Sequence, residues 1–303
     1  KPLTLEQIQC VRWYCVNDCL NTRDIVNTLS EQINLRYEMS NQYKVDLRSK
    51  SDAQIAERVI ESELRKTLGR IKRPEIAPGT TYFYEPPAFM KFQTELMQRV
   101  LTTVRRTPLV VGENGAIELP EEIGALKLEI GNGLYRMGVG GLHSSEKAIS
   151  HYAKDGYLLI DKDVTSYYPA IILNNGYAPK HLGRDFLRVY RSIVDRRIAA
   201  KQAKQDIIAQ SLKIVVNGSF GKFGSKWSIL YSPDLLLQVT ITGQLALLML
   251  IEMLELNGIA VVSANTDGIV IRPRVDQMIK LDHVIAWWER ATGFNTEETR
   301  YLS

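Results

Sequence analysis

The chain contains little cysteine and histidine: three cysteines and four histidines among 303 residues. Cys10, Cys15 and Cys19 all fall on one expected helix near the start, and an odd number crowded there does not make a disulfide framework. No histidine lies nearby and the spacing fits no common zinc pattern, which disfavours a metal site. We therefore expect buried, reduced thiols in a cytosolic protein.

The sequence also lacks a targeting peptide, an internal repeat and a low-complexity segment. Its longest apolar run lies within 241–258, where Gln244 and Glu252 interrupt it. We expect a buried helix, because the run is too short and too interrupted to span a bilayer. No start methionine precedes Lys1, and the final "EETRYLS" carries no stop signal, so we expect a fragment of a longer protein.

A strong net charge is absent as well, since 38 basic and 34 acidic residues give +4. This excess is too mild to indicate nucleic-acid binding by itself, so local clusters matter more. A hydrophobic content of 45% with 24% charged residues is ordinary for a globular protein with a large core and more than one domain.

Periodicity and capping residues predict an alternation of helices and short strands. Helices are expected over 4–29, 51–69, 91–101, 232–258 and 274–293, and a helical hairpin over 184–218 with its reversal near Gln205. Asn132-Gly133 predicts a β-hairpin, and the glycines at 138, 140 and 141 would let the backbone approach another segment. We expect an α+β fold with a sheet covered on one face.

The first of three informative motifs is "DVTSYYPAII" at 163–172. Asp163 ends an apolar strand and precedes a sharp Tyr-Pro turn, where it could hold a cation at the rim of a sheet. By strand alternation, Asp161 points to the same side. Taken alone, the pattern favours a solvated strand end.

The second motif is the helical hairpin, with a basic stripe at Arg197, Lys201 and Lys204. Lys213 and Asn217 lie four residues apart on its returning helix. Two such stripes can bind a polyanion such as a triphosphate. The nearby "NGSFGKFG" does not fit a P-loop, which needs four residues between its glycines.

The third motif is "VVSANTDGIVI" at 261–271, which reads as two apolar strands around a polar turn. Asp267 sits at the tip between Thr266 and Gly268. Asn265 stands two residues earlier, where a second acid would look natural.

Together these motifs resemble those of family B DNA polymerases, especially those of bacteriophages. "DVTSYYPAII" resembles motif A (D-x-x-S-L-Y-P-S-I-I), "KIVVNGSFGKFG" motif B (K-x-x-x-N-S-x-Y-G) and "SANTDG" motif C (Y-x-D-T-D-S). Lys213 lies 50 residues after Asp163, and Asp267 lies 50 after Asn217. Three degenerate motifs in the right order are far more specific than one. Upstream, "YCVND" at 14–18 resembles the last exonuclease motif, and "GGLHS" at 140–144 a stretch often found before motif A.

The resemblance implies a right-hand polymerase fragment that lacks the thumb and most of the exonuclease domain. The expected parts are the last exonuclease helices (1–50), a connector with the start of the palm (51–155), palm with motif A (156–185), fingers (186–216), and palm with motifs B and C (217–303).

The implied activity is DNA-templated DNA synthesis from dNTPs by a two-metal mechanism with Mg²⁺, or Mn²⁺ in its place, in phage genome replication. The expected partners are primer–template DNA, dNTPs and the remaining polymerase domains, with no membrane, in the host-cell cytoplasm. The implied site residues are Asp163 and Asp267 (catalytic and metal-binding), the Val164 carbonyl (third metal ligand), Tyr168, Arg197, Lys201, Lys213 and Asn217 (nucleotide), Asn265, Thr266, Phe220 and Gly221 (supporting), and Tyr14 with Asp18 (exonuclease remnant).

Three residues depart from the family pattern: Asn265 replaces the first acid of motif C, while Phe220 and Gly218 replace a tyrosine and a serine in motif B. The site would then carry one charge fewer than usual. Two alternatives stay open: a catalytically incomplete fragment that only binds primer–template DNA, and part of a proofreading nuclease built around Asp18. A protein-primed polymerase would need a large insertion between motifs A and B, for which there is no room.

Overall fold

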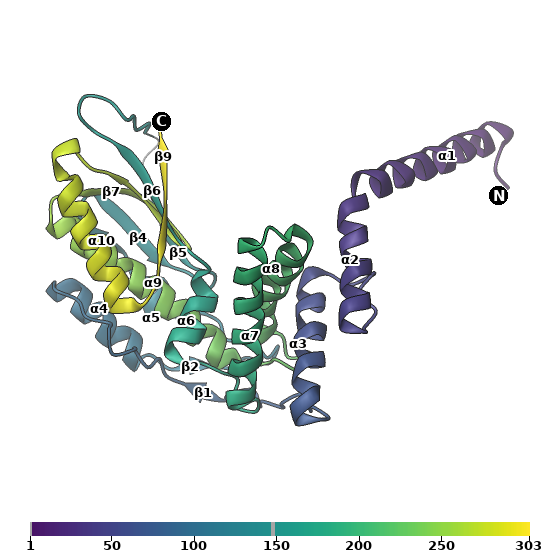
Figure 1. Ribbon diagram of the computed structural model, residues 1–303, viewed down its shortest axis with the longest axis horizontal. Helices are drawn as coiled ribbons and strands as arrows, with labels where there is room; N and C mark the ends of the chain where they lie inside the picture. Colours follow the sequence, from purple (N-terminus) through teal and green to yellow (C-terminus); the bar gives the residue numbers. More distant parts are fainter. Residues whose placement is uncertain (1, 147–148) are drawn as a thin grey trace.

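The computed structural model describes residues 2–146 and 149–303 (Figure 1). Helices span Leu5–Thr28 (α1), Ser30–Tyr43 (α2), Asp52–Leu68 (α3), Glu95–Arg106 (α4), Glu121–Gly124 (α5), Tyr167–Asn175 (α6), Gly183–Gln202 (α7), Asp206–Phe220 (α8), Pro233–Leu256 (α9) and Met278–Thr292 (α10), with 3-10 turns at Gly221–Gly224 (η1) and Val275–Gln277 (η2). Strands span Thr81–Tyr82 (β1), Leu109–Val110 (β2), Leu128–Ile130 (β3), Gly133–Met137 (β4), Leu142–Ser144 (β5), Leu159–Val164 (β6), Ala260–Asn265 (β7), Gly268–Arg272 (β8) and Thr296–Tyr301 (β9).

The expected α+β class is confirmed, and the sheet is antiparallel. Seven strands form one sheet in the order β3-β4-β5-β7-β8-β6-β9, and all neighbouring pairs are antiparallel. Helix α9 lies against β3, β5 and β7, and α10 packs against α9 (Figure 1). The Trp288 indole N–H donates to the Ala246 carbonyl at 2.8 Å and joins these two helices. Figure 1 shows both helices on one side of the sheet, as the sequence predicts.

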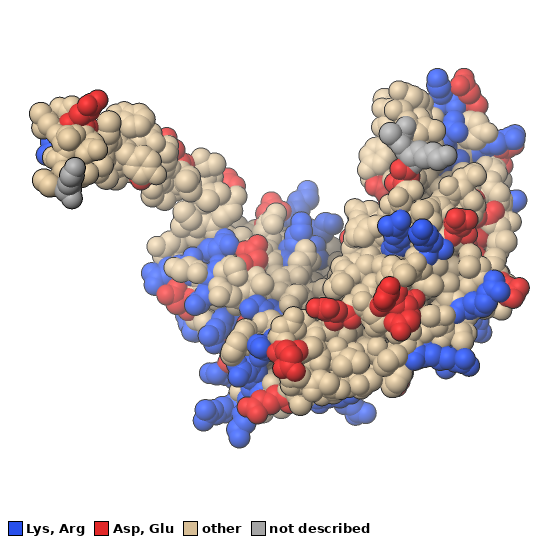
Figure 2. All heavy atoms as spheres, turned by 180° about the vertical axis from the view of Figure 1, so that it is seen from behind, with Lys and Arg blue, Asp and Glu red and all other residues tan. Residues whose placement is uncertain are grey.

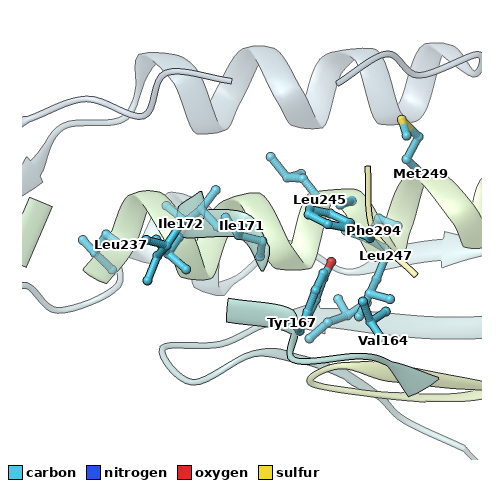
Figure 3. Close-up of a cluster of buried hydrophobic side chains, with 14 of the residues drawn as sticks. Val164, Tyr167, Ile171, Ile172, Leu237, Leu245, Leu247, Met249 and Phe294 are labelled. Atoms are coloured by element: carbon cyan, nitrogen blue, oxygen red, sulfur yellow. The ribbon is translucent and has the colours of Figure 1, made fainter. Parts of the chain in front are cut away.

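Helix α9 forms the centre of the core. Figure 3 shows Leu237 of this helix beside Ile172 of α6, and Leu245 and Leu247 near Phe294. The expectation of a buried helix is confirmed, but its stated reason was wrong. By length and composition α9 is long and apolar enough to cross a membrane, yet most of its residues are buried inside the protein.

A buried carboxylate on α9 fixes the start of α4. Glu252 accepts hydrogen bonds from the Gln93 amide (2.9 Å), the Thr94 amide (2.8 Å) and the Thr94 hydroxyl (2.6 Å). Burying a charge is tolerated when its hydrogen-bonding capacity is satisfied in this way. Helix α4 therefore begins at Glu95 and continues to Arg106, later than the expected 91–101.

The expected helical hairpin is confirmed as α7 and α8, with the reversal at 203–205. Helix α8 packs against α3 on its other side. In Figure 1 this hairpin stands beside the sheet, with α6 and part of α9 between them at the base. The surface seen in Figure 2 is hollowed between the hairpin side and the sheet side.

The N-terminal segment corrects one expectation. Helix α1 contains no buried residue, and Cys10, Cys15 and Cys19 are exposed rather than buried. The reason is that α1 projects from the rest of the molecule and contacts α2, which follows it (Figure 1). Helix α2 and strand β9 were not predicted from the sequence.

Candidate functional site

Asp163 and Asp267, which lie 104 residues apart in the sequence, come together at one end of the sheet. Asp163 is opposite Gly268 in the pairing of β6 with β8. The Val164 amide donates to the Asp267 carbonyl at 2.8 Å. This hydrogen bond joins the end of β6 to the tip of the β7–β8 hairpin.

The surroundings of both carboxylates disfavour their ionisation. Partial burial, and then the negative charge of Asp267, raises the pKa of Asp163 from 3.8 to about 6. Burial also raises the pKa of Asp267, and the charge of Asp161 acts in the same direction. Among the described residues, neither Asp163 nor Asp267 is paired with a lysine or arginine. The pair therefore concentrates negative charge that a cation would offset.

The tip of the β7–β8 hairpin has an uncommon backbone. Thr266 has φ 44°, a left-handed conformation that β-branched residues rarely adopt. The Thr266 amide donates to the Leu142 carbonyl at 2.8 Å, and its hydroxyl donates to the Asn265 side-chain oxygen at 3.2 Å. These contacts hold the turn that presents Asp267, and they use the amide oxygen of Asn265.

The glycine-rich segment packs against this tip, so the close backbone approach expected from its glycines is found at Gly141 and Gly138, whereas Gly140 has open space around it. A Cβ at Gly141 would lie 2.9 Å from the Thr266 side chain, so only glycine allows this approach. The buried Gln244 side chain accepts from the Gly138 amide and donates to the Gly138 carbonyl, both at 2.9 Å. This loop therefore supports the hairpin from the side of β5.

Tyr168 connects three segments around the site. Its hydroxyl donates to the Gly140 carbonyl at 2.6 Å. Its ring stacks on Phe220 of α8, with centroids 4.1 Å apart and 16° between the planes. Phe220 cannot make the hydrogen bond of a tyrosine, but its ring holds α8 against α6.

The helical hairpin also reaches the sheet through Arg197. Its guanidinium donates to the Ser166 hydroxyl at 3.1 Å, three residues after Asp163. Lys213 and Asn217 are exposed and lie on the same stripe of α8 as Phe220, by i, i+4, i+7 spacing. Lys201 is exposed one turn beyond Arg197 toward the hairpin tip, and the described structure gives it no ion-pair partner. Gly221 follows Phe220 and is exposed.

Strand β9 adds an acid that sequence reasoning missed. Glu297 is opposite Asp163 in the pairing of β6 with β9, and it accepts from the Thr165 hydroxyl at 3.3 Å. On the same strand, the Tyr301 hydroxyl donates to Asp161 at 2.8 Å. The run "TEETRY" carries no hydrophobic alternation, so no sequence signal marked it as a strand of the sheet.

The donors at this site fit Mg²⁺ in part. Within residues 2–146 and 149–303, no three acidic, histidine or cysteine side chains are gathered closely enough to enclose a metal ion. Mg²⁺ prefers oxygen ligands and commonly takes only one or two carboxylates from the protein, the rest coming from water and substrate phosphates. Asp163, Asp267 and the Val164 carbonyl supply oxygen donors of that kind.

Tyr14 and Asp18 lie away from this site, on α1. Both side chains are exposed to solvent.

No protein-family model matches the chain, and no curated protein matches it. Among solved structures, the chain is similar to the family B DNA polymerase from the hyperthermophilic archaeon Pyrobaculum calidifontis, with 13% sequence identity and a TM-score of 0.46. The match covers 99% of this chain and 36% of that polymerase, so the chain spans about a third of its length. A likeness at this level decides neither family nor function.

Proposed function

We propose that this chain carries the nucleotidyl-transfer site of a DNA polymerase that extends a primer 3′-hydroxyl with deoxynucleotides on a DNA template. One observation carries the proposal. The acids of two separate motifs meet, because Asp163 on β6 lies beside the turn before β8 that carries Asp267, and motif B contacts the same place through the stack of Phe220 on Tyr168.

In this proposal the sheet with α9 and α10 is the palm, and α7 with α8 forms the fingers. The contact of Arg197 with Ser166 supports this division, because it directs a cationic face of α7 toward the acids. Residues 1–50 correspond to the exonuclease helices of the family pattern, and 51–155 to the connector and first part of the palm.

Asp163, Asp267 and the Val164 carbonyl would hold Mg²⁺. When bound, Mg²⁺ would offset charge on the triphosphate and favour the ionised form of the attacking 3′-oxygen. Arg197, Lys201 and Lys213 would bind the triphosphate and stabilise charge that develops in the transition state.

Tyr168 and Asn265 have supporting parts in the proposal. The ring of Tyr168 is fixed by Phe220 and Gly140, and a fixed ring beside the sugar would exclude a 2′-hydroxyl. The side-chain oxygen of Asn265 already accepts from Thr266, so we assign Asn265 to the shape of the turn and to a bound water.

Primer extension by this chain with Mg²⁺ and dNTPs tests the proposal. We expect Asp163→Ala and Asp267→Ala each to reduce incorporation by at least about a hundredfold, because a charge-stabilising group is lost. Asn265→Ala should cause a milder loss of about tenfold, as for a residue that orients a ligand. The matched control is Asp282→Ala, an exposed acid on α10, which should extend like the parent chain.

Normal extension by either aspartate variant would contradict the assignment. Binding of primer–template DNA without any extension by the parent chain would favour the alternative of a catalytically incomplete fragment.

A further inference from the structure

Outside the candidate site, Trp227 is exposed to solvent although the turn that follows it is packed against the protein. Trp227 is 73% exposed, whereas Ser228, Leu230 and Tyr231, which follow it, are buried. The Ile229 amide donates to Glu57 of α3 at 2.9 Å, which fixes the turn to the body of the molecule. A large aromatic ring presented to water by a fixed backbone is unusual, because tryptophan is highly buried on average.

Two cations flank this ring. The Arg73 guanidinium lies 5.2 Å and the Lys226 ammonium 5.5 Å from the ring centroid. At such distances cation–π attraction holds, but neither group is in close stacking contact. Arg70 and Lys72 are exposed in the same short segment as Arg73, just after α3.

These four basic residues differ from their basic neighbours in that they form no ion pairs among the described residues. Arg65 and Lys66, at the end of α3, form ion pairs with Glu61 and Glu63. In the part of the chain that the structure describes, Arg70, Lys72, Arg73 and Lys226 form no ion pair with an acid. Figure 2 shows Lys and Arg gathered at the lower left, over the part of the molecule that contains α3 and α7.

Unpaired cations beside an exposed tryptophan ring favour one class of binding partner. Unpaired cations suit any polyanion, but a flat exposed ring among them adds a surface on which another flat ring can stack. An acidic peptide would use the cations alone, and a lipid surface would call for several apolar side chains rather than one. Single-stranded nucleic acid offers both phosphates and unpaired bases.

We propose that Arg70, Lys72, Arg73, Lys226 and Trp227 form a basic–aromatic surface that binds single-stranded nucleic acid, with a base stacked on Trp227 and phosphates at the cations. Trp227 belongs to the segment that leaves Phe220 and Gly221 and leads to α9, so the surface is joined by a short piece of chain to the candidate site. Naming the strand as the unpaired part of a template rests on the proposed function.

Fluorescence anisotropy with a labelled oligo-dT of about 12 nucleotides, without Mg²⁺ or dNTPs, tests this surface. We expect Trp227→Ala to weaken binding about tenfold and Trp227→Phe to restore most of it, because a phenyl ring still stacks. Replacing Arg70, Lys72 and Arg73 together by alanine should reduce the slope of log affinity against log salt by about 2, at about 0.7 for each phosphate contact.

Two variants serve as matched controls. Trp13→Ala removes a tryptophan on α1 that is 70% exposed and has no cation over its ring among the described contacts. Arg105→Ala removes an exposed arginine of α4. Both should bind oligo-dT like the parent chain, and a duplex of equal length should be insensitive to Trp227→Ala.

Unchanged binding by Trp227→Ala, or an equal loss in Trp13→Ala, would overturn the inference while leaving the primer-extension result untouched. Conversely, Trp227-dependent binding in a chain that shows no extension would support the surface and contradict the proposed function.

Discussion

The surroundings of Asp163 favour its protonated form over its charged form. Burial and the neighbouring Asp267 raise its pKa to about 6, so the folded protein binds a proton there more tightly than the unfolded chain does. The stability contributed by that proton is fully present below pH 3.8 and is lost as the pH rises through 6. At neutral pH, Asp163 therefore destabilises the metal-free fold.

We expect Asp163→Asn to raise the thermal unfolding midpoint in EDTA at pH 7.5, and this gain should shrink as the pH falls toward 4. Addition of Mg²⁺ at pH 7.5 should raise the midpoint of the parent chain and not that of the variant, because a ligand stabilises only the state that binds it. Differential scanning calorimetry at the two pH values measures both effects. A lower midpoint for Asp163→Asn at pH 7.5 would show that the repulsion is not the governing interaction.

Single residues also show how far the sequence determines the site. The identities of Asp163 and Asp267 could be read from their motifs, and in the structure Asp163 lies on β6 while Asp267 lies in the turn just before β8. Glu297 could not be found, because its strand is recognised only through its pairing with β6. The exposure of the three cysteines was mispredicted, since a helical pattern does not tell whether another element covers the helix.

At the scale of elements, α3 and α8 are held at close range by one glycine. A Cβ at Gly218 would lie 2.7 Å from the Asp52 carbonyl oxygen and 3.1 Å from the Ala56 side chain. A serine, as in the family motif that this segment resembles, has no room there. The departure at Gly218 thus has a packing cause.

We expect Gly218→Ala to reduce the free energy of unfolding by about 1–3 kcal/mol, because a backbone oxygen must move to admit the methyl group. Urea denaturation followed by circular dichroism measures the change. The matched control is Gly221→Ala, where a Cβ meets nothing within 4 Å, and this variant should be neutral. Equal stability of the two variants would mean that α3 and α8 can move apart to admit the methyl group without a loss of stability.

Elements with strong local signals were the ones that the sequence predicted well. Helices α1 and α3 begin with capping boxes at Thr4 and Ser51, the residues at which the expected ranges 4–29 and 51–69 start. Helix α2 was missed because its start at Ser30 has no side-chain cap and follows α1 after one residue. The start of α4 depends on the distant Glu252, which no local pattern reveals.

For the whole molecule, the contrast between α1 and the rest is the main feature. Helix α1 contributes no buried residue, whereas α2 and the loop after it add Met39, Tyr43 and Leu47 to the core. We therefore expect α2 to unfold cooperatively together with the core, and α1 to contribute little to this cooperative unit.

We expect deletion of residues 1–28 to change the free energy of unfolding by less than about 1 kcal/mol, as for surface changes that touch no core contact. Deletion of 1–50 also removes the three buried side chains and should cost several times more. Thermal and urea unfolding of both deletions, compared with the full chain, measures the difference. A large loss from the shorter deletion would show that α1 is packed against the protein in solution.

The antiparallel pairing of β6 with β8 has a consequence for how the protein reaches its native state. The hairpin α7–α8 is made of consecutive residues and can form early, whereas β6 and β8 must close a loop of about a hundred residues before they meet. Asp163 and Asp267 therefore stay apart throughout the early steps. The charge pair, and any affinity for a divalent cation that depends on it, would arise only once β6 and β8 have paired.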